Sequence, residues 1–223
     1  MTRTTLFILI FFTILFSSDF NISTSRPGSY SPTSSVGNNI NQLEIGLNYN
    51  NENNYLWFFN RLGVGSKNEI QLTYYAKSLS LGYMYGNIKL DKRLFSSIIL
   101  TTEFQKDNFE INNLAICIPF EYTLKENITL SSHLNFHLYR NINFKDIQFS
   151  YALAISHNIN EKTTFFAEIY GTTLGSKENF FDFGFVYSTS NQIQYDISCG
   201  IMINDNFNSD SSYFLENGFS FYF

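Results

Sequence analysis

Residues 214–223 of this chain read FLENGFSFYF and decide its fold. Phe219, Phe221 and Phe223 fall on one face of an extended chain, and small or polar side chains alternate with them. This period of two predicts a strand with one apolar and one polar face. In a soluble sandwich, which is the alternative interpretation, such a last strand would be an aggregation-prone edge, whereas a closed membrane barrel pairs that edge and turns the apolar face to lipid. We therefore interpret it as part of a transmembrane β-barrel.

The same ending resembles the assembly signal of bacterial outer-membrane barrels. The resemblance rests on Phe219, Phe221 and Phe223 at the end of the sequence. It implies that the barrel-assembly machinery binds these residues. It also implies that the protein lies in the bacterial outer membrane, in contact with outer-membrane lipid.

The start of the sequence has the features of an export signal. Arg3 precedes the apolar run 6–16 (LFILIFFTILF), and the small residues Ser17 and Ser18 follow. This order is typical of a cleaved secretory signal peptide, and the run is shorter than the roughly 20 residues of a membrane-spanning helix. A short membrane anchor is the alternative. We predict a signal peptide at 1–18, an irregular extension at 19–41 that is periplasmic or lies in the lumen, and a barrel at 42–223.

The composition supports a barrel with one domain. Aromatic residues make up 18% of the 223 residues and charged residues 15%, and no later run is apolar enough for a membrane helix. The apolar side chains must therefore alternate along strands, as in membrane barrels. The net charge of −5 argues against a nucleic-acid partner. We place Cys117 and Cys199 on apolar faces as lipid-facing or packing residues, and we expect no bridge between them.

Twelve alternating runs separated by polar turns follow the extension. An even number is typical of single-chain bacterial barrels and places both termini on the periplasmic side, and ten strands is the alternative. Short polar connections follow the even-numbered runs, as periplasmic turns should. The facing of the fifth run is ambiguous. The predicted strands are 42–50, 55–63, 69–77, 79–89, 94–104, 112–124, 128–139, 146–157, 163–174, 179–189, 193–204 and 213–223.

Several motifs resemble a family of outer-membrane transporters named for the MetA pathway of phenol degradation. Ser25 stands where that family usually has Asp, and its middle-strand Pro-Thr-Gly is absent near 101–104. The resemblance implies a barrel with a transport role and does not define the substrate. The motifs are SRPGSYSP at 25–32, QLEIG at 42–46, RLGV at 61–64 before NEI at 68–70, FAEIYG at 166–171 and QYDISCG at 194–200.

Polar side chains on the inward face are the candidate functional residues. Arg26, Arg61 and Lys89 are candidate partners for the carboxylates, because buried charges need partners or water. In an aqueous channel these carboxylates would set a cation preference, and in a narrow lumen they would form a filling network instead. The predicted lumen-lining residues are Glu44, Glu121, His133, His137, Glu168, Asp182, Asp196 and Glu216.

Catalysis is not favoured by the sequence. His133 and His137 lie four residues apart on one predicted strand, about 13 Å, which is too far for one metal ion. A Ser–His pair with Asn on nearby strands could form a hydrolase triad, as in outer-membrane phospholipases, but no nucleophile motif supports it. We expect no enzyme activity, no metal and no cofactor. The predicted function is passive passage of small solutes, with hydrophobic or aromatic compounds as candidates. The alternatives are a closed structural or surface-interaction barrel and a lipid-active hydrolase.

Overall fold

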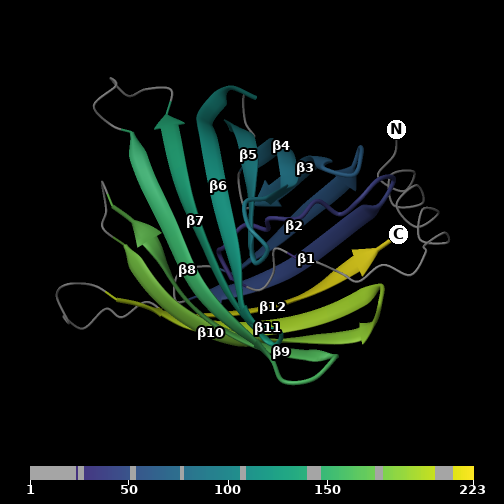
Figure 1. Cartoon of the computed structure of the whole chain (residues 1–223). Coiled ribbons are helices and arrows are strands. Elements are labelled where there is room, and N and C mark those ends of the chain that lie inside the picture. Colours follow the sequence, from purple (N-terminus) through teal and green to yellow (C-terminus); the bar gives the residue numbers. More distant parts are fainter. Residues whose placement is uncertain are drawn as a thin grey trace, which may run out of the picture.

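A computed structural model describes residue 24 and residues 28–50, 54–75, 78–105, 109–139, 147–173, 178–203 and 213–223. Within these ranges the chain forms twelve strands in one closed antiparallel barrel (Figure 1). The described residues include no helix long and apolar enough to cross a membrane. The strands are β1 (Asn41–Asn50), β2 (Asn54–Gly63), β3 (Asn68–Tyr75), β4 (Ser78–Lys89), β5 (Leu94–Gln105), β6 (Ile111–Lys125), β7 (Ile128–Tyr139), β8 (Gln148–Asn158), β9 (Thr163–Thr172), β10 (Asn179–Ser190), β11 (Ile193–Met202) and β12 (Tyr213–Tyr222).

The first and last strands close the barrel. Each strand pairs with its neighbours in the sequence, and β1 pairs with β12 in the register Gln42 to Tyr222 through Asn50 to Phe214. Beyond that register, Asn41 and Phe223 exchange two backbone hydrogen bonds, of 2.8 and 2.9 Å. The predicted transmembrane barrel of twelve strands is confirmed, and the predicted strand boundaries differ from the observed ones by at most two residues.

The two faces of the wall differ as the alternation predicts. On β7, Leu134, Phe136 and Leu138 are exposed, whereas Ser131 and His133 are buried. The same alternation places large apolar side chains on the outside of the other strands. An apolar outer surface and a polar interior are the arrangement of a barrel that sits in lipid.

An irregularity in the pairing of β5 explains why the sequence did not show which of its side chains face the lumen. The β4–β5 pairing shifts register between Tyr85 and Ile88. Next to this irregularity Ser96 and Ser97 are both buried, and Ile99 is buried in contact with Met84 and Cys117. Cys117 is therefore a packing residue, which is one of the two predicted roles, and it does not face lipid. Cys117 and Cys199 are both free cysteines in this structure.

The C-terminal aromatic residues do not share one environment. Phe219 is exposed and Phe221 is half-buried, whereas Phe223 follows the end of β12 and is buried, with 6% of its surface exposed. The alternation of β12 therefore stops before the last residue. The role of the three phenylalanines in assembly stays a prediction.

Residues 28–40, here called the N-terminal segment, form neither helix nor strand. The end of this segment binds the last residue of β2, before the short turn to β3. Asn39 N–H donates to the Gly63 carbonyl (3.0 Å), and Gly63 N–H donates to the Ile40 carbonyl (2.9 Å). Further back, Asn87 N–H donates to the Thr33 carbonyl (2.8 Å). The predicted signal peptide at 1–18 lies outside the described residues.

Candidate functional site

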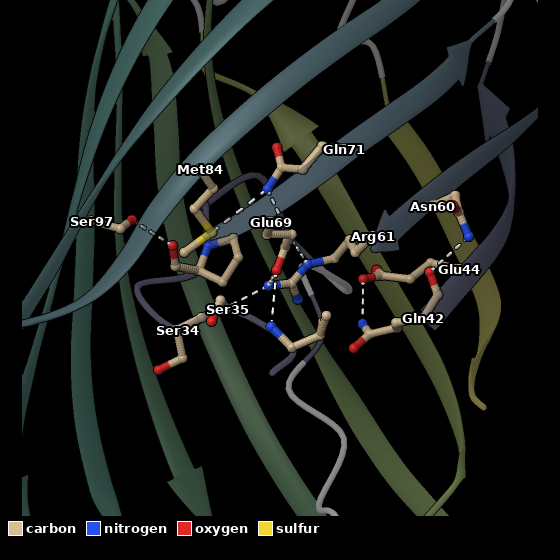
Figure 2. A network of polar contacts seen from close by, with 12 residues as sticks. Ser34, Ser35, Gln42, Glu44, Asn60, Arg61, Glu69, Gln71, Met84 and Ser97 are labelled. Atoms are coloured by element: carbon tan, nitrogen blue, oxygen red, sulfur yellow. Dashed lines mark hydrogen bonds and ion pairs between the residues drawn. The ribbon is translucent and has the colours of Figure 1, made fainter. Parts of the chain in front are cut away.

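A buried ion pair lies at the centre of the polar network in Figure 2. Arg61 of β2 and Glu69 of β3 are both fully buried. The guanidinium donates through Nε to Oε1 (2.7 Å) and through Nη2 to Oε2 (3.0 Å) of the carboxylate. Gln71 Nε2 donates to the same carboxylate (2.8 Å). This bidentate geometry with an added donor is what makes a buried ion pair tolerable.

The same ion pair holds the N-terminal segment. Arg61 Nη2 donates to the Ser34 carbonyl (2.8 Å), and Val36 N–H donates to Glu69 Oε2 (2.9 Å). On β5, Ser97 Oγ donates to the Pro32 carbonyl (3.0 Å). Backbone groups of the segment therefore form hydrogen bonds with the donor and acceptor atoms of Arg61 and Glu69 that remain beside the ion pair.

The other end of the segment binds the opposite wall. Ser29 N–H donates to Glu168 Oε2 on β9 (2.7 Å), and Ser31 N–H donates to His133 Nδ1 on β7 (3.1 Å). The strands β3 and β9 are six positions apart in a ring of twelve, so Glu69 and Glu168 lie on opposite sides. Residues 29–36 of the segment thus cross the lumen.

Tyr30 lies among the lumen carboxylates. Burial raises the pKa of its phenol, and the charges of Glu121, Glu168 and Glu44 raise that pKa further. The phenol is therefore neutral at ordinary pH and can donate a hydrogen bond.

The predicted lumen-lining residues differ in burial. Of the predicted partners, Arg61 is paired, Lys89 is exposed, and Arg26 lies outside the described residues. Sequence reasoning missed Glu69, although it alternates in phase with Gln71 on β3 and lies on the strand next to Arg61. The buried residues are Glu44, His133, Glu168, Asp182 and Asp196, and the half-buried ones are Glu121, His137 and Glu216.

Two cavities border the N-terminal segment in the lumen, and both are lined by Gly28, Ser29 and Trp57. One, of about 520 Å³, lies against β1–β3 and β9–β12 and includes Asp182 and Glu216. The other, of about 330 Å³, lies against β2–β7 and includes His137. A larger apolar hollow lies against β3–β8 and is lined mainly by exposed side chains such as Leu81, so it belongs to the lipid-facing surface.

His133 and His137 have different hydrogen-bond partners: Ser31 of the N-terminal segment for His133, and two side chains of the wall for His137. His137 Nε2 lies 3.0 Å from Ser150 Oγ, and its Nδ1 lies 3.0 Å from Asn113 Nδ2. Sequence reasoning named neither Ser150 nor Asn113, because the register of three strands brings them together. The described residues contain no group of three or more His, Cys, Asp or Glu side chains suited to a metal ion.

Solved structures of outer-membrane channels share this fold. The NanC porin (TM-score 0.61, 13% identity) matches 80% of this chain and 98% of its own length. The KdgM porin in complex with disordered oligogalacturonate (0.66, 8%) matches 81% and 98%, and the CymD monoaromatic hydrocarbon channel (0.51, 8%) matches 84% and 88%. No protein-family model matches the chain, and no curated protein matches it.

These comparisons support a porin-like barrel and, with the apolar outer face, a location in the bacterial outer membrane. The identities are so low that the likeness extends to the fold alone. The resemblance to the MetA-pathway transporter family is not confirmed and stays a prediction.

Proposed function

We propose that this chain is an outer-membrane channel for passive passage of small solutes, narrowed by its own N-terminal segment. The observation that carries the proposal is a closed barrel whose interior holds two cavities, of about 520 and 330 Å³, beside that segment. Larger barrels leave a lumen for water or ligands, whereas small barrels fill theirs with side chains. The channels among the structural neighbours have the same type of wall.

The N-terminal segment would set the width of the path. It is held across the lumen by hydrogen bonds from its backbone to Glu69, Glu168 and His133. A solute would pass beside the segment or displace it. If the segment closes the lumen completely, the protein is the structural or surface-interaction barrel that the sequence left as an alternative.

Planar-bilayer recording tests the channel. We expect discrete current steps from the purified full chain in KCl. A matched variant without residues 28–36 should give larger steps, since the part that crosses the lumen is removed. An absence of current from both proteins, under all salt and voltage conditions, would contradict the proposal and favour the structural barrel.

Ester hydrolysis inside the lumen is a second candidate function, because Ser150, His137 and Asn113 lie in a row. If the Asn113 amide is turned by 180°, its oxygen accepts from Nδ1–H, and Nε2 can then accept the Ser150 proton. In the present orientation Asn113 Oδ1 is buried without a hydrogen-bond partner. Turning the amide would therefore break no hydrogen bond of this oxygen. The row faces the lumen, so its substrate would be a passing ester and not a membrane lipid.

Covalent labelling tests this second candidate directly. Diisopropyl fluorophosphate phosphorylates serines that a histidine activates, and intact-protein mass spectrometry counts the adduct. We expect one adduct on the full chain and none on Ser150→Ala or His137→Gln, whereas Ser156→Ala should label normally. An unlabelled full chain would rule out an activated Ser150 and leave conductance unaffected.

A further inference from the structure

The larger lumen cavity combines carboxylates with aromatic side chains. Asp182 of β10 and Glu216 of β12 line it, together with the exposed Glu178 that precedes β10. The aromatic rings that line it come from five strands, β2, β3, β9, β10 and β12. They belong to Tyr55, Trp57, Tyr75, Tyr170, Phe180 and Phe214.

The carboxylates of this cavity have no cationic partner among the described residues. Asp182 is 98% buried, and its Oδ1 makes no hydrogen bond. Its neighbour in register on β9 is Glu168, which is another buried carboxylate. Glu216 accepts one hydrogen bond, from Trp57 Nε1 (3.3 Å). Like charges that face each other across a strand pair, with an unpaired buried oxygen, are costly unless a positive group or a bound proton neutralises them.

Arginine and lysine side chains of the described residues do not supply that positive group. Arg61 is the only one of them that is buried, and Glu69 binds it. The other described lysines and arginine are exposed beside the short turns. Asp182 therefore provides a negative site inside the lumen that a ligand can fill.

The aromatic walls define what kind of cation fits. Tyr170 and Phe180 stack with centroids 5.1 Å apart, and Phe214 meets Phe180 at 6.3 Å. Gly200 makes this possible, because a Cβ there would overlap the Phe214 ring and approach Asp182 Cβ to 2.7 Å. The Phe214 ring therefore lies over Gly200, the residue that pairs with Asp182 across β10 and β11. Aromatic faces attract ammonium groups, most strongly where water is excluded.

We infer that this cavity binds an organic monocation, an ammonium group that carries an apolar or aromatic body. The carboxylates would neutralise the charge, and the rings would contact the body and the N-methyl or N–H groups. The inference rests on the proposed channel function, for which it names the substrate class. Hard metal ions need several oxygen ligands, and the described residues contain no group of three or more His, Cys, Asp or Glu side chains suited to such an ion.

Equilibrium dialysis of the full chain in detergent measures the binding directly, with benzyltrimethylammonium as the probe. Benzyl alcohol and benzoate serve as neutral and anionic probes of similar size, at equal ionic strength. We expect saturable binding of the cation and much weaker binding of the other two. Trp57 is the only tryptophan of the chain and lines the cavity, so its fluorescence should change with the same midpoint.

Two variants locate the site. Asp182→Asn and Glu216→Gln should each weaken binding by about tenfold, as expected for the loss of one charge partner. Both changes keep the side-chain shape, and Asp182→Asn also removes a like-charge pair, so the barrel should fold. Asp91→Asn makes the same chemical change in an exposed turn and should leave binding unchanged.

Equal binding of benzyl alcohol, or full binding by both variants, would overturn the inference. The outcome is separate from that of the channel proposal, because dialysis needs no current. Cation binding without conductance would contradict the channel only. Conductance without saturable cation binding would contradict the site only.

Discussion

At the scale of single residues, Arg61 is a fully buried charge that needs its partner Glu69. It is the only buried cation of the described chain and links β2, β3 and the N-terminal segment through Glu69 and Ser34. Arg61→Gln leaves the Glu69 carboxylate buried without its charge partner, which costs about 3–5 kcal/mol. We therefore expect a clear fall in the temperature at which the barrel unfolds on heat-modifiability gels.

The paired variant separates charge from packing. Arg61→Gln combined with Glu69→Gln removes both charges, and most of the lost stability should return, as a double-mutant cycle would measure. Lys162→Gln, at an exposed turn, is the control and should have no effect. An unchanged unfolding temperature for Arg61→Gln alone would show that the ion pair is not needed.

Gly63 gives a second prediction at the residue scale. A Cβ on Gly63 would overlap the Gly37 carbonyl oxygen, and Gly37 itself has a φ of 96°, which favours glycine. Gly63→Ala should therefore loosen the docked end of the N-terminal segment, with a loss of about 1–3 kcal/mol from overpacking. Limited proteolysis should then cut near residues 37–40. Gly65→Ala, whose Cβ would meet only Asn68 Nδ2 at 3.3 Å, should stay resistant.

At the scale of elements, the N-terminal segment can be locked by one substitution. Cys117 Sγ on β6 lies 3.5 Å from Ser31 Oγ of the segment. Ser31→Cys in a Cys199→Ser background should form a disulfide under oxidation and tether the segment to the wall. If solutes displace the segment, oxidation should lower the conductance and dithiothreitol should restore it. The same protein with Cys117→Ser should not respond to oxidation.

The strand β12 carries the prediction on assembly. Its pairing with β1 covers residues 214–222, and Phe223 adds two hydrogen bonds to Asn41. Truncation before Phe219 removes about half of that seam and opens an edge on both strands, so the chain should be exported but should not form a heat-modifiable barrel. Deletion of Phe223 alone should give a partial defect. Normal insertion of the truncated chain would contradict the role of β12 in closure.

The elements differ in how far the sequence could predict them. Ile128–Tyr139 was predicted to the residue, because every second residue from Ile128 to Leu138 is apolar except Ser132. The facing of β5 could not be predicted, because a register shift against β4 lets Ser96 and Ser97 both be buried. The path of residues 28–40 was also out of reach. It depends on Glu69 and Glu168, which only barrel closure places on opposite walls.

The candidate site shows the same limit. Period two was enough to predict that Asp182 and Glu216 are candidates for the lumen. The sequence did not show that these carboxylates share a cavity with Phe180 and Phe214, since that depends on the register of β10, β11 and β12 and on the missing side chain of Gly200.

At the scale of the whole molecule, the described part of the interior carries an excess of negative charge. Among the described residues, the interior holds five buried carboxylates and one buried cation. The exposed cations of these described residues lie at or beside the short turns that join β2–β3, β4–β5, β6–β7 and β8–β9. They are Lys67, Lys89, Lys92, Arg93, Lys125 and Lys162.

This layout predicts a cation-selective path, because a solute inside the lumen meets a net negative field in a partly water-excluded space. In a KCl gradient the reversal potential should have the sign of K⁺ preference. The preference should shrink from 0.1 to 1 M salt, since the screening length falls from about 10 to about 3 Å. Glu168→Gln combined with Asp182→Asn should reduce it further, whereas Glu126→Gln, at an exposed turn, should not. A preference for chloride in the unmodified protein would mean that the permeant path avoids these carboxylates.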